Sequence, residues 1–79
     1  MNELRLLADE LDLEYEENEE TFTFCLTKNI ELICKPKEKW TIVYKMRNGK
    51  TKNRFCFYNN DKLKSYICCQ YALECFQLA

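Results

Sequence analysis

The chain of 79 residues contains no histidine, a single glycine (Gly49) and a single proline (Pro36). Without histidine, the commonest general base and a frequent metal ligand are missing, so zinc sites and histidine-activated nucleophiles are disfavoured. The scarcity of glycine and proline argues against a linker, a low-complexity tail or a loop-rich disulfide scaffold. A chain of this length and composition is expected to form one small folded domain.

Long hydrophobic runs are also missing. No stretch of about 18 apolar residues is present, so we expect no segment that crosses a membrane. The first residues, Met1-Asn2-Glu3-Leu4-Arg5, lack the basic start and apolar core of a signal peptide. We therefore expect a cytoplasmic protein. In the absence of a metal or catalytic motif, we expect neither a cofactor nor an enzyme.

Six cysteines stand out against these absences: Cys25, Cys34, Cys56, Cys68, Cys69 and Cys75. An even number of cysteines suggests disulfides in a secreted protein. Without an export signal, we instead expect reduced thiols that act as small apolar side chains. No Cys-x-x-Cys pair is present, so the spacing does not indicate a zinc site.

The net charge of −1 hides a strong asymmetry. Residues 1–20 contain nine acids and one base, Arg5, which gives this segment a net charge of −8. Residues 21–79 contain eleven bases and four acids, a net charge of +7. Within them, residues 35–54 hold eight bases and one acid, Glu38. Such segregation bears on partners and association rather than on fold.

Helical periodicity appears at the start of the chain. Apolar residues recur at helical spacing, which predicts a helix within residues 1–13: Leu4, Leu7, Ala8 and Leu11. Residues 14–20 follow and are almost purely acidic, so we interpret them as a solvated loop.

A second helix is predicted over residues 60–78, with Asn60 or Asp61 as its cap. Gln70, Glu74 and Gln77 share one narrow polar arc of this helix, which we expect to face solvent. The remaining surface is apolar, including Phe76, and is wide enough to need cover on more than one side. Two partners are candidates to cover this apolar surface, the first helix and a second subunit.

Alternating apolar residues predict four strands, over residues 21–26, 30–35, 40–47 and 50–57. A three-residue loop over 27–29 places Phe24 beside Leu32 and keeps the apolar face whole. In this loop we expect Asn29 to be the left-handed residue of a bulge.

The dipeptide Asn48-Gly49 predicts a type I′ hairpin turn between the last two strands. Continuous pairing from this turn places Arg47 opposite Lys50 and Lys45 opposite Lys52. With Ile42 and Tyr44 directed to the core, five bases should form a basic strip on the other face: Lys45, Arg47, Lys50, Lys52 and Arg54.

These elements predict a single α+β domain spanning residues 1–79, in the order α-β-β-β-β-α. The simplest arrangement is an antiparallel four-stranded meander, over residues 21–58, with both helices packed on one face. The helices occupy residues 1–13 and 60–78, and the acidic loop occupies residues 14–20.

The basic strip favours nucleic-acid binding through phosphate contacts, although the predicted exposed face lacks aromatic residues for base stacking. The order helix, antiparallel strands, helix is similar to that of double-stranded-RNA-binding domains. Residues 69–74, Cys-Gln-Tyr-Ala-Leu-Glu, resemble that family's last helix. The family's basic cluster at the start of this helix is reduced to Lys62 and Lys64, and a fourth strand is present, so we do not assign the chain to it.

The acidic head favours a different function, protein binding. Its carboxylates are Asp9, Glu10, Asp12, Glu14, Glu16, Glu17, Glu19 and Glu20. A cluster of this kind can occupy a site that normally holds nucleic acid, and electrostatic steering speeds the encounter. In size, charge and lack of histidine, the chain looks like phage-encoded inhibitors of host defence, anti-CRISPR proteins among them. This likeness carries over no residue role.

We therefore predict a non-enzymatic protein-binding module, an inhibitor from a phage or mobile element that acts in the bacterial cytosol. Its acidic patch would bind a host nucleic-acid-handling or defence complex. Nucleic-acid binding by the basic strip is the alternative function. For both charged segments the plainer interpretation is a solvated surface. The chain is expected to be a monomer or a homodimer formed through the helix over residues 60–78.

Overall fold

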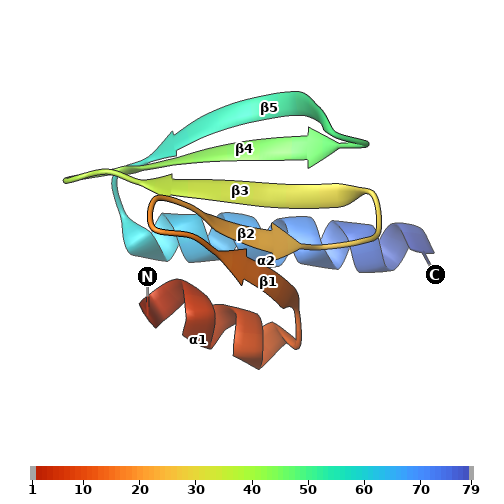
Figure 1. Ribbon diagram of the computed structural model, residues 1–79. Helices are drawn as coiled ribbons and strands as arrows, with labels where there is room; N and C mark the ends of the chain where they lie inside the picture. Colours follow the sequence, from red (N-terminus) through yellow and green to blue (C-terminus); the bar gives the residue numbers. More distant parts are fainter. Residues whose placement is uncertain (1, 79) are drawn as a thin grey trace.

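The computed structural model describes the backbone of residues 2–78 and the side chains of residues 3–76. Its elements are α1 (Asn2–Leu11), β1 (Glu14–Glu17), β2 (Phe22–Cys25), β3 (Ile30–Pro36), β4 (Thr41–Arg47), β5 (Lys50–Phe57) and α2 (Asn60–Leu78). The strands form one antiparallel sheet in chain order, with β1 and β5 at its two edges (Figure 1). The predicted α+β meander between two helices is confirmed, but it has five strands rather than four.

The additional strand, β1, comes from the segment that we expected to be an acidic loop, residues 14–20. Tyr15 explains the difference, because it pairs with Phe24 and its ring stacks on that of Phe22 at 4.9 Å. One aromatic side chain thus anchors an otherwise acidic strand to the core. The remaining residues of the segment form the turn that leads into β2.

The first helix ends at Leu11, before the predicted end at residue 13. Asp12 adopts a left-handed conformation with φ of 54°, and the Leu13 N–H donates to the Ala8 carbonyl at 2.8 Å. This capping geometry stops α1 and directs the chain into β1.

Both helices contribute to a single hydrophobic core with one face of the sheet, here called the covered face. Its buried residues are Leu4, Leu7, Ala8, Phe22, Phe24, Leu26, Ile30, Leu32, Cys34, Val43, Leu63 and Ile67. Figure 1 shows α2 running along the sheet and α1 beside β1. Within residues 2–78 no helix lies on the opposite side of the sheet, here called the open face.

The connection between β2 and β3 has the predicted register. Phe24 pairs with Leu32, and the Leu26 N–H donates to the Ile30 carbonyl at 3.0 Å. The predicted left-handed conformation of Asn29 is wrong, since the positive-φ residues other than glycine in the described chain are Asp12 and Asn48. Asn29 is instead held by its carbonyl, which accepts from the Asn48 N–H at 2.8 Å.

The hairpin between β4 and β5 starts as predicted and then departs from the expected register. Asn48 (φ 54°) and Gly49 (φ 77°) have the type I′ conformation, and Arg47 pairs with Lys50. Lys45, however, pairs with Asn53 instead of Lys52. Lys52 is therefore the extra residue of a β-bulge, which shifts every later pair by one residue.

The faces of β4 are the reverse of those we predicted. Val43 pairs with Cys34 and Lys45 pairs with Leu32, so Val43, Lys45 and Arg47 lie on the covered face. Tyr44 and Ile42 therefore lie on the open face, although Ile42 is still buried there. The turn after β3 sets this arrangement, because the Lys37 N–H donates to the Trp40 carbonyl at 2.7 Å and Pro36 pairs with Thr41.

The second helix has the predicted bounds but a different cap and rotation. Asn59, rather than Asn60 or Asp61, caps it, since its Oδ1 accepts from the Asp61 N–H at 2.7 Å. Glu74, which we expected to face solvent, is 5% exposed and points toward the sheet. Phe76, which we expected to be buried, is 83% exposed. The side chain of Gln77 lies outside the described residues.

Candidate interaction surfaces

The sequence-predicted acidic residues gather at one edge of the sheet and form a surface here called the acidic edge. It comprises Asp9, Glu10, Asp12, Glu14, Glu16, Glu17, Glu19 and Glu20, all of which are exposed. They come from α1, from the residue that ends it, from β1 and from the turn into β2. Because β1 is an edge strand of the sheet, it pairs with one strand, β2.

The acidic edge is built on ordered backbone. The Asn18 N–H donates to the Thr21 carbonyl at 2.9 Å and closes the turn that carries Glu19 and Glu20. Arg5 of α1 forms an ion pair with Glu17, and this hydrogen bond and charge raise the pKa of the Arg5 guanidinium. Among the described side chains, Arg5 is the one cation that forms an ion pair with this edge.

The predicted basic strip is not assembled on one face. Lys45 and Arg47 point toward α2, Lys50 and Lys52 lie at the end of the hairpin, and Arg54 lies on the open face. The bulge at Lys52 and the reversed faces of β4 together separate these five residues.

Lys45 and Arg47 form a polar cluster with α2 at the edge of the core. Their cationic nitrogens lie 3.9 Å and 3.8 Å from Glu74 Oε1, and Lys45 Nζ donates to Gln70 Oε1 at 2.6 Å. A buried carboxylate needs partners of this kind, because an unpaired buried charge is strongly destabilising. The cluster therefore fixes which side of α2 faces the sheet.

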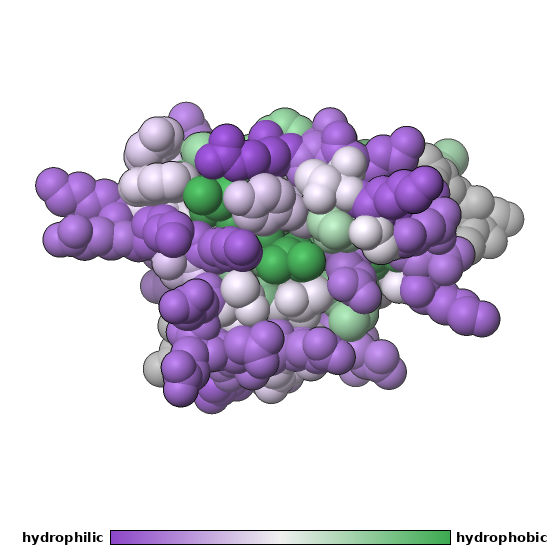
Figure 2. Space-filling view, turned by 45° about the horizontal axis from the view of Figure 1, so that its top comes forward, coloured by the Kyte–Doolittle hydropathy of each residue, from purple (hydrophilic) through white to green (hydrophobic). Residues whose placement is uncertain are grey.

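An aromatic residue, Tyr44, lies on the open face, where the sequence predicted no aromatic side chain. Tyr44 has Lys35 Nζ 5.3 Å from its ring centroid and Arg54 Cζ 5.9 Å from it, both within cation–π range. The sequence did not predict this location of Tyr44, because it depends on which face of β4 packs against the helices. On the side of the molecule visible in Figure 2, apolar side chains lie at the centre within a rim of hydrophilic ones.

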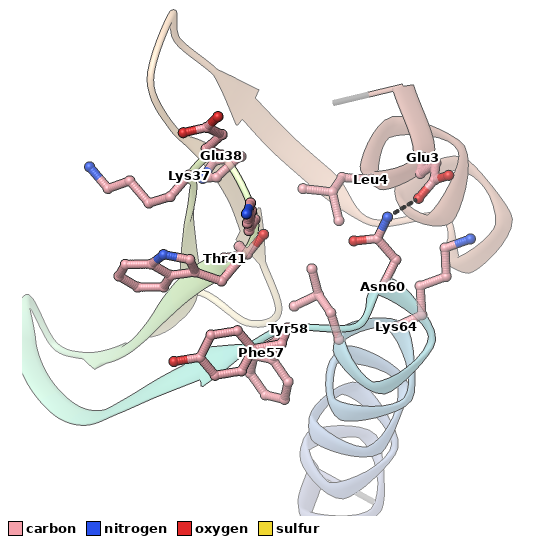
Figure 3. Close-up of a pocket in the computed structure, with 13 residues that line it drawn as sticks. Glu3, Leu4, Lys37, Glu38, Thr41, Phe57, Tyr58, Asn60 and Lys64 are labelled. Atoms are coloured by element: carbon pink, nitrogen blue, oxygen red, sulfur yellow. Dashed lines mark hydrogen bonds between the residues drawn. The ribbon is translucent and has the colours of Figure 1, made fainter.

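A pocket of about 590 Å³ opens between the start of α1, the turn between β3 and β4, the end of β5 and the start of α2 (Figure 3). Leu4, Phe57 and Leu63 contribute apolar lining, and the rings of Trp40 and Tyr58 lie 6.2 Å apart. Asn60 Nδ2 donates to Glu3 Oε2 at 2.9 Å and joins the two helices at the rim. The sequence did not predict this pocket, because the residues that line it are far apart in the chain.

The six cysteines are free thiols. Cys34 is buried, and burial raises the pKa of its thiol to about 12. Among the side chains that the structure describes, no three cysteines or carboxylates are placed to hold a metal ion. No helix within residues 2–78 has the length and apolar character needed to cross a membrane.

Comparison with known proteins gives no match, whether to a family model, a curated protein or a solved structure. The functional conclusion therefore depends on the chemistry of the surfaces described above.

Proposed function

We propose that this protein is a small binding module whose acidic edge binds a basic surface of a protein partner. The partner is a nucleic-acid-handling protein, and the acidic edge occupies its nucleic-acid site, so that the module acts as an inhibitor. The observation that carries this proposal is that the acidic segment forms an ordered edge strand with every carboxylate exposed.

Order matters because a preorganised surface loses less conformational freedom when it binds. Glu14 and Glu16 project to the same face of β1, roughly 6.8 Å apart along the strand. Asp9 and Glu10 of α1 extend the acidic surface beyond the strand. Such a fixed row of negative charge steers and orients a basic partner, which chiefly raises the association rate and the specificity.

The test compares a neutralised acidic edge with a matched control. Glu14→Gln, Glu16→Gln, Glu19→Gln and Glu20→Gln remove four charges without touching the Arg5–Glu17 pair, whereas Glu31→Gln with Glu38→Gln removes acids elsewhere. A partner captured from a bacterial lysate is purified, and its binding to its own nucleic acid is measured with each protein added. We expect the wild type and the control to compete and the neutralised variant to lose competition. Equal competition by all three proteins would refute the proposal.

Tyr44 favours a second candidate function, binding of single-stranded nucleic acid on the open face. An exposed sheet face with an aromatic ring and flanking cations provides both stacking and phosphate contacts. Lys35 and Arg54 supply those cations at 5.3 Å and 5.9 Å from the ring.

Binding to labelled single- and double-stranded DNA and RNA, at about 50 mM and about 200 mM salt, tests this second function. Tyr44→Ala should weaken binding of single strands about tenfold or more, because base stacking on an aromatic contributes about 1–3 kcal/mol. Lys50→Ala with Lys52→Ala, at the hairpin end, is the control and should change mainly the salt dependence. Absence of binding at the lower salt concentration removes nucleic acid from consideration.

A further inference from the structure

The second helix turns apolar side chains outward in its C-terminal half. Leu63 and Ile67 face the sheet and are 2% and 0% exposed, but the next residues on this side are Gln70 and Glu74. The opposite side carries an outward stripe of exposed residues: Ser65, Cys69, Ala72, Leu73 and Phe76. Leu73 is 51% exposed and Phe76 is 83% exposed.

This rotation is unfavourable for an isolated chain. Exposed apolar surface costs about 25 cal/mol per Å² relative to burial, whereas a buried ion cluster is often no better than apolar packing of similar volume. With Glu74 buried and Phe76 exposed, the chain forgoes the usual burial of the apolar side of a helix. The arrangement is favourable if another surface covers the outward stripe.

We propose that the outward stripe of α2 binds the same stripe of a second copy of this chain. The positions 65, 69, 72 and 76 are separated by four, three and four residues, which is the spacing of the seam through which two helices pair. No residue of the stripe is charged, so two copies meet without repulsion at the contact.

The sizes of the side chains along the stripe make it self-complementary. Ser65, Cys69 and Ala72 are small, and Phe76 at the far end is large. In an antiparallel pair of helices related by a twofold axis between Cys69 and Ala72, Phe76 of each copy lies opposite Ser65 of the other. Each large side chain thus fills the space left by a small one, as a symmetric interface requires.

The stripe also lies away from the acidic edge. Tyr66 and Leu73 are seven residues apart and share one side of α2, and Tyr66 packs on Phe55 and Phe57 of β5, each with ring centroids 5.1 Å apart. Most residues of the acidic edge belong to β1 and the turn after it, at the opposite edge of the sheet from β5. A dimer through the stripe therefore keeps the two acidic edges apart and leaves both accessible.

Sedimentation over a range of protein concentrations tests the proposal. We expect a dimer for the wild type, a monomer for Phe76→Glu, and a dimer dissociation constant at least about 30-fold higher for Phe76→Ala, as for the truncation of a large aromatic residue that anchors an interface. Leu6→Glu is the matched control, because Leu6 is 62% exposed on α1 and lies outside the stripe. A wild type that stays monomeric, or a Phe76→Glu variant that stays dimeric, would overturn the proposal.

Cross-linking distinguishes this dimer from one formed elsewhere. Cys69 and Cys56 are both exposed, but Cys69 lies in the stripe and Cys56 on the open face. In a Cys75→Ser background, which removes the other exposed thiol of α2, a short bifunctional maleimide should cross-link the protein and its Cys56→Ser variant into dimers and should fail with Cys69→Ser. Cross-linking that depends on Cys56 instead would place the contact on the open face and contradict the proposal.

Discussion

Cys34 is the residue whose acid–base chemistry differs most clearly from that of the unfolded chain. Burial raises the pKa of its thiol from 9.0 to about 12. Between these values the unfolded chain loses a proton that the folded chain keeps, so the stability of the fold decreases as the pH rises. The contribution of this group is fully present below pH 9 and is lost as the pH rises through 12.

We predict that Cys34 makes the free energy of unfolding fall by about 1.4 kcal/mol per pH unit above pH 9. Urea denaturation of the wild type and of Cys34→Ala at about pH 8, 9 and 10 measures this contribution, and the substitution should remove it. Cys56→Ala, at an exposed thiol, is the control and should keep the wild-type slope. Parallel pH profiles for wild type and Cys34→Ala would contradict the assignment.

Gly49 offers a second prediction for a single residue. A Cβ atom added there would meet no atom within 4 Å, but the residue has φ of +77°. Gly49→Ala should therefore destabilise the protein by about 1–2 kcal/mol through backbone strain alone. Asn48→Gly, which suits the neighbouring positive φ, should change stability by less than about 0.5 kcal/mol. Chemical denaturation of both variants gives the comparison, and a neutral Gly49→Ala would show that the turn relaxes.

At the scale of the elements, alternation predicted the pairing of β2 with β3 but not the orientation of β4. Both faces of β4 are apolar near its start, and Ile42 and Val43 are both buried. The pattern within the strand therefore cannot select the covered face. The turn before β4 and the polar cluster around Glu74 select it, and these involve residues far apart in the chain. The acidic residues, by contrast, were identifiable from composition alone.

Breaking the polar cluster between β4 and α2 should destabilise the protein. Glu74→Ala leaves Lys45 and Arg47 facing α2 without a counter-charge. We expect this substitution to lower the free energy of unfolding by about 1–3 kcal/mol. The loss is limited to this range because both cations retain some access to water. Lys45→Met, Arg47→Leu and Glu74→Leu together should restore or exceed wild-type stability. Urea denaturation measures both variants. A triple variant less stable than Glu74→Ala would show that the cluster contributes more than apolar packing could.

For the whole molecule, the order of the sheet converts the charge asymmetry of the sequence into a spatial one. The first 20 residues carry a net charge of −8, and their strand forms one edge. The other edge, β5, carries Lys50, Lys52 and Arg54. The sequence predicted the charges of the two parts, but their separation in space depends on the position of each strand in the sheet.

This separation predicts unusual behaviour on ion exchangers. At pH 7 and about 20 mM salt, where exposed charges are weakly screened, the protein should be retained by both an anion exchanger and a cation exchanger despite its net charge of −1. Neutralising Glu14, Glu16, Glu19 and Glu20 with glutamine should abolish retention on the anion exchanger alone. Passage of the wild type through both columns would show that the two charged regions offset each other.

The bulge in β5 gives this strand one residue more than its pairing with β4 requires. Lys52 has an exposed side chain, so most replacements of it should be tolerated. Loss of its codon should be tolerated as well, because Thr51 and Asn53 already pair with Met46 and Lys45, so regular pairing keeps every later residue on its face. Phe55 and Phe57 would then stay on the covered face, and both rings would keep their contact with Tyr66. Inherited change at this position can therefore include the loss of one residue as well as substitution.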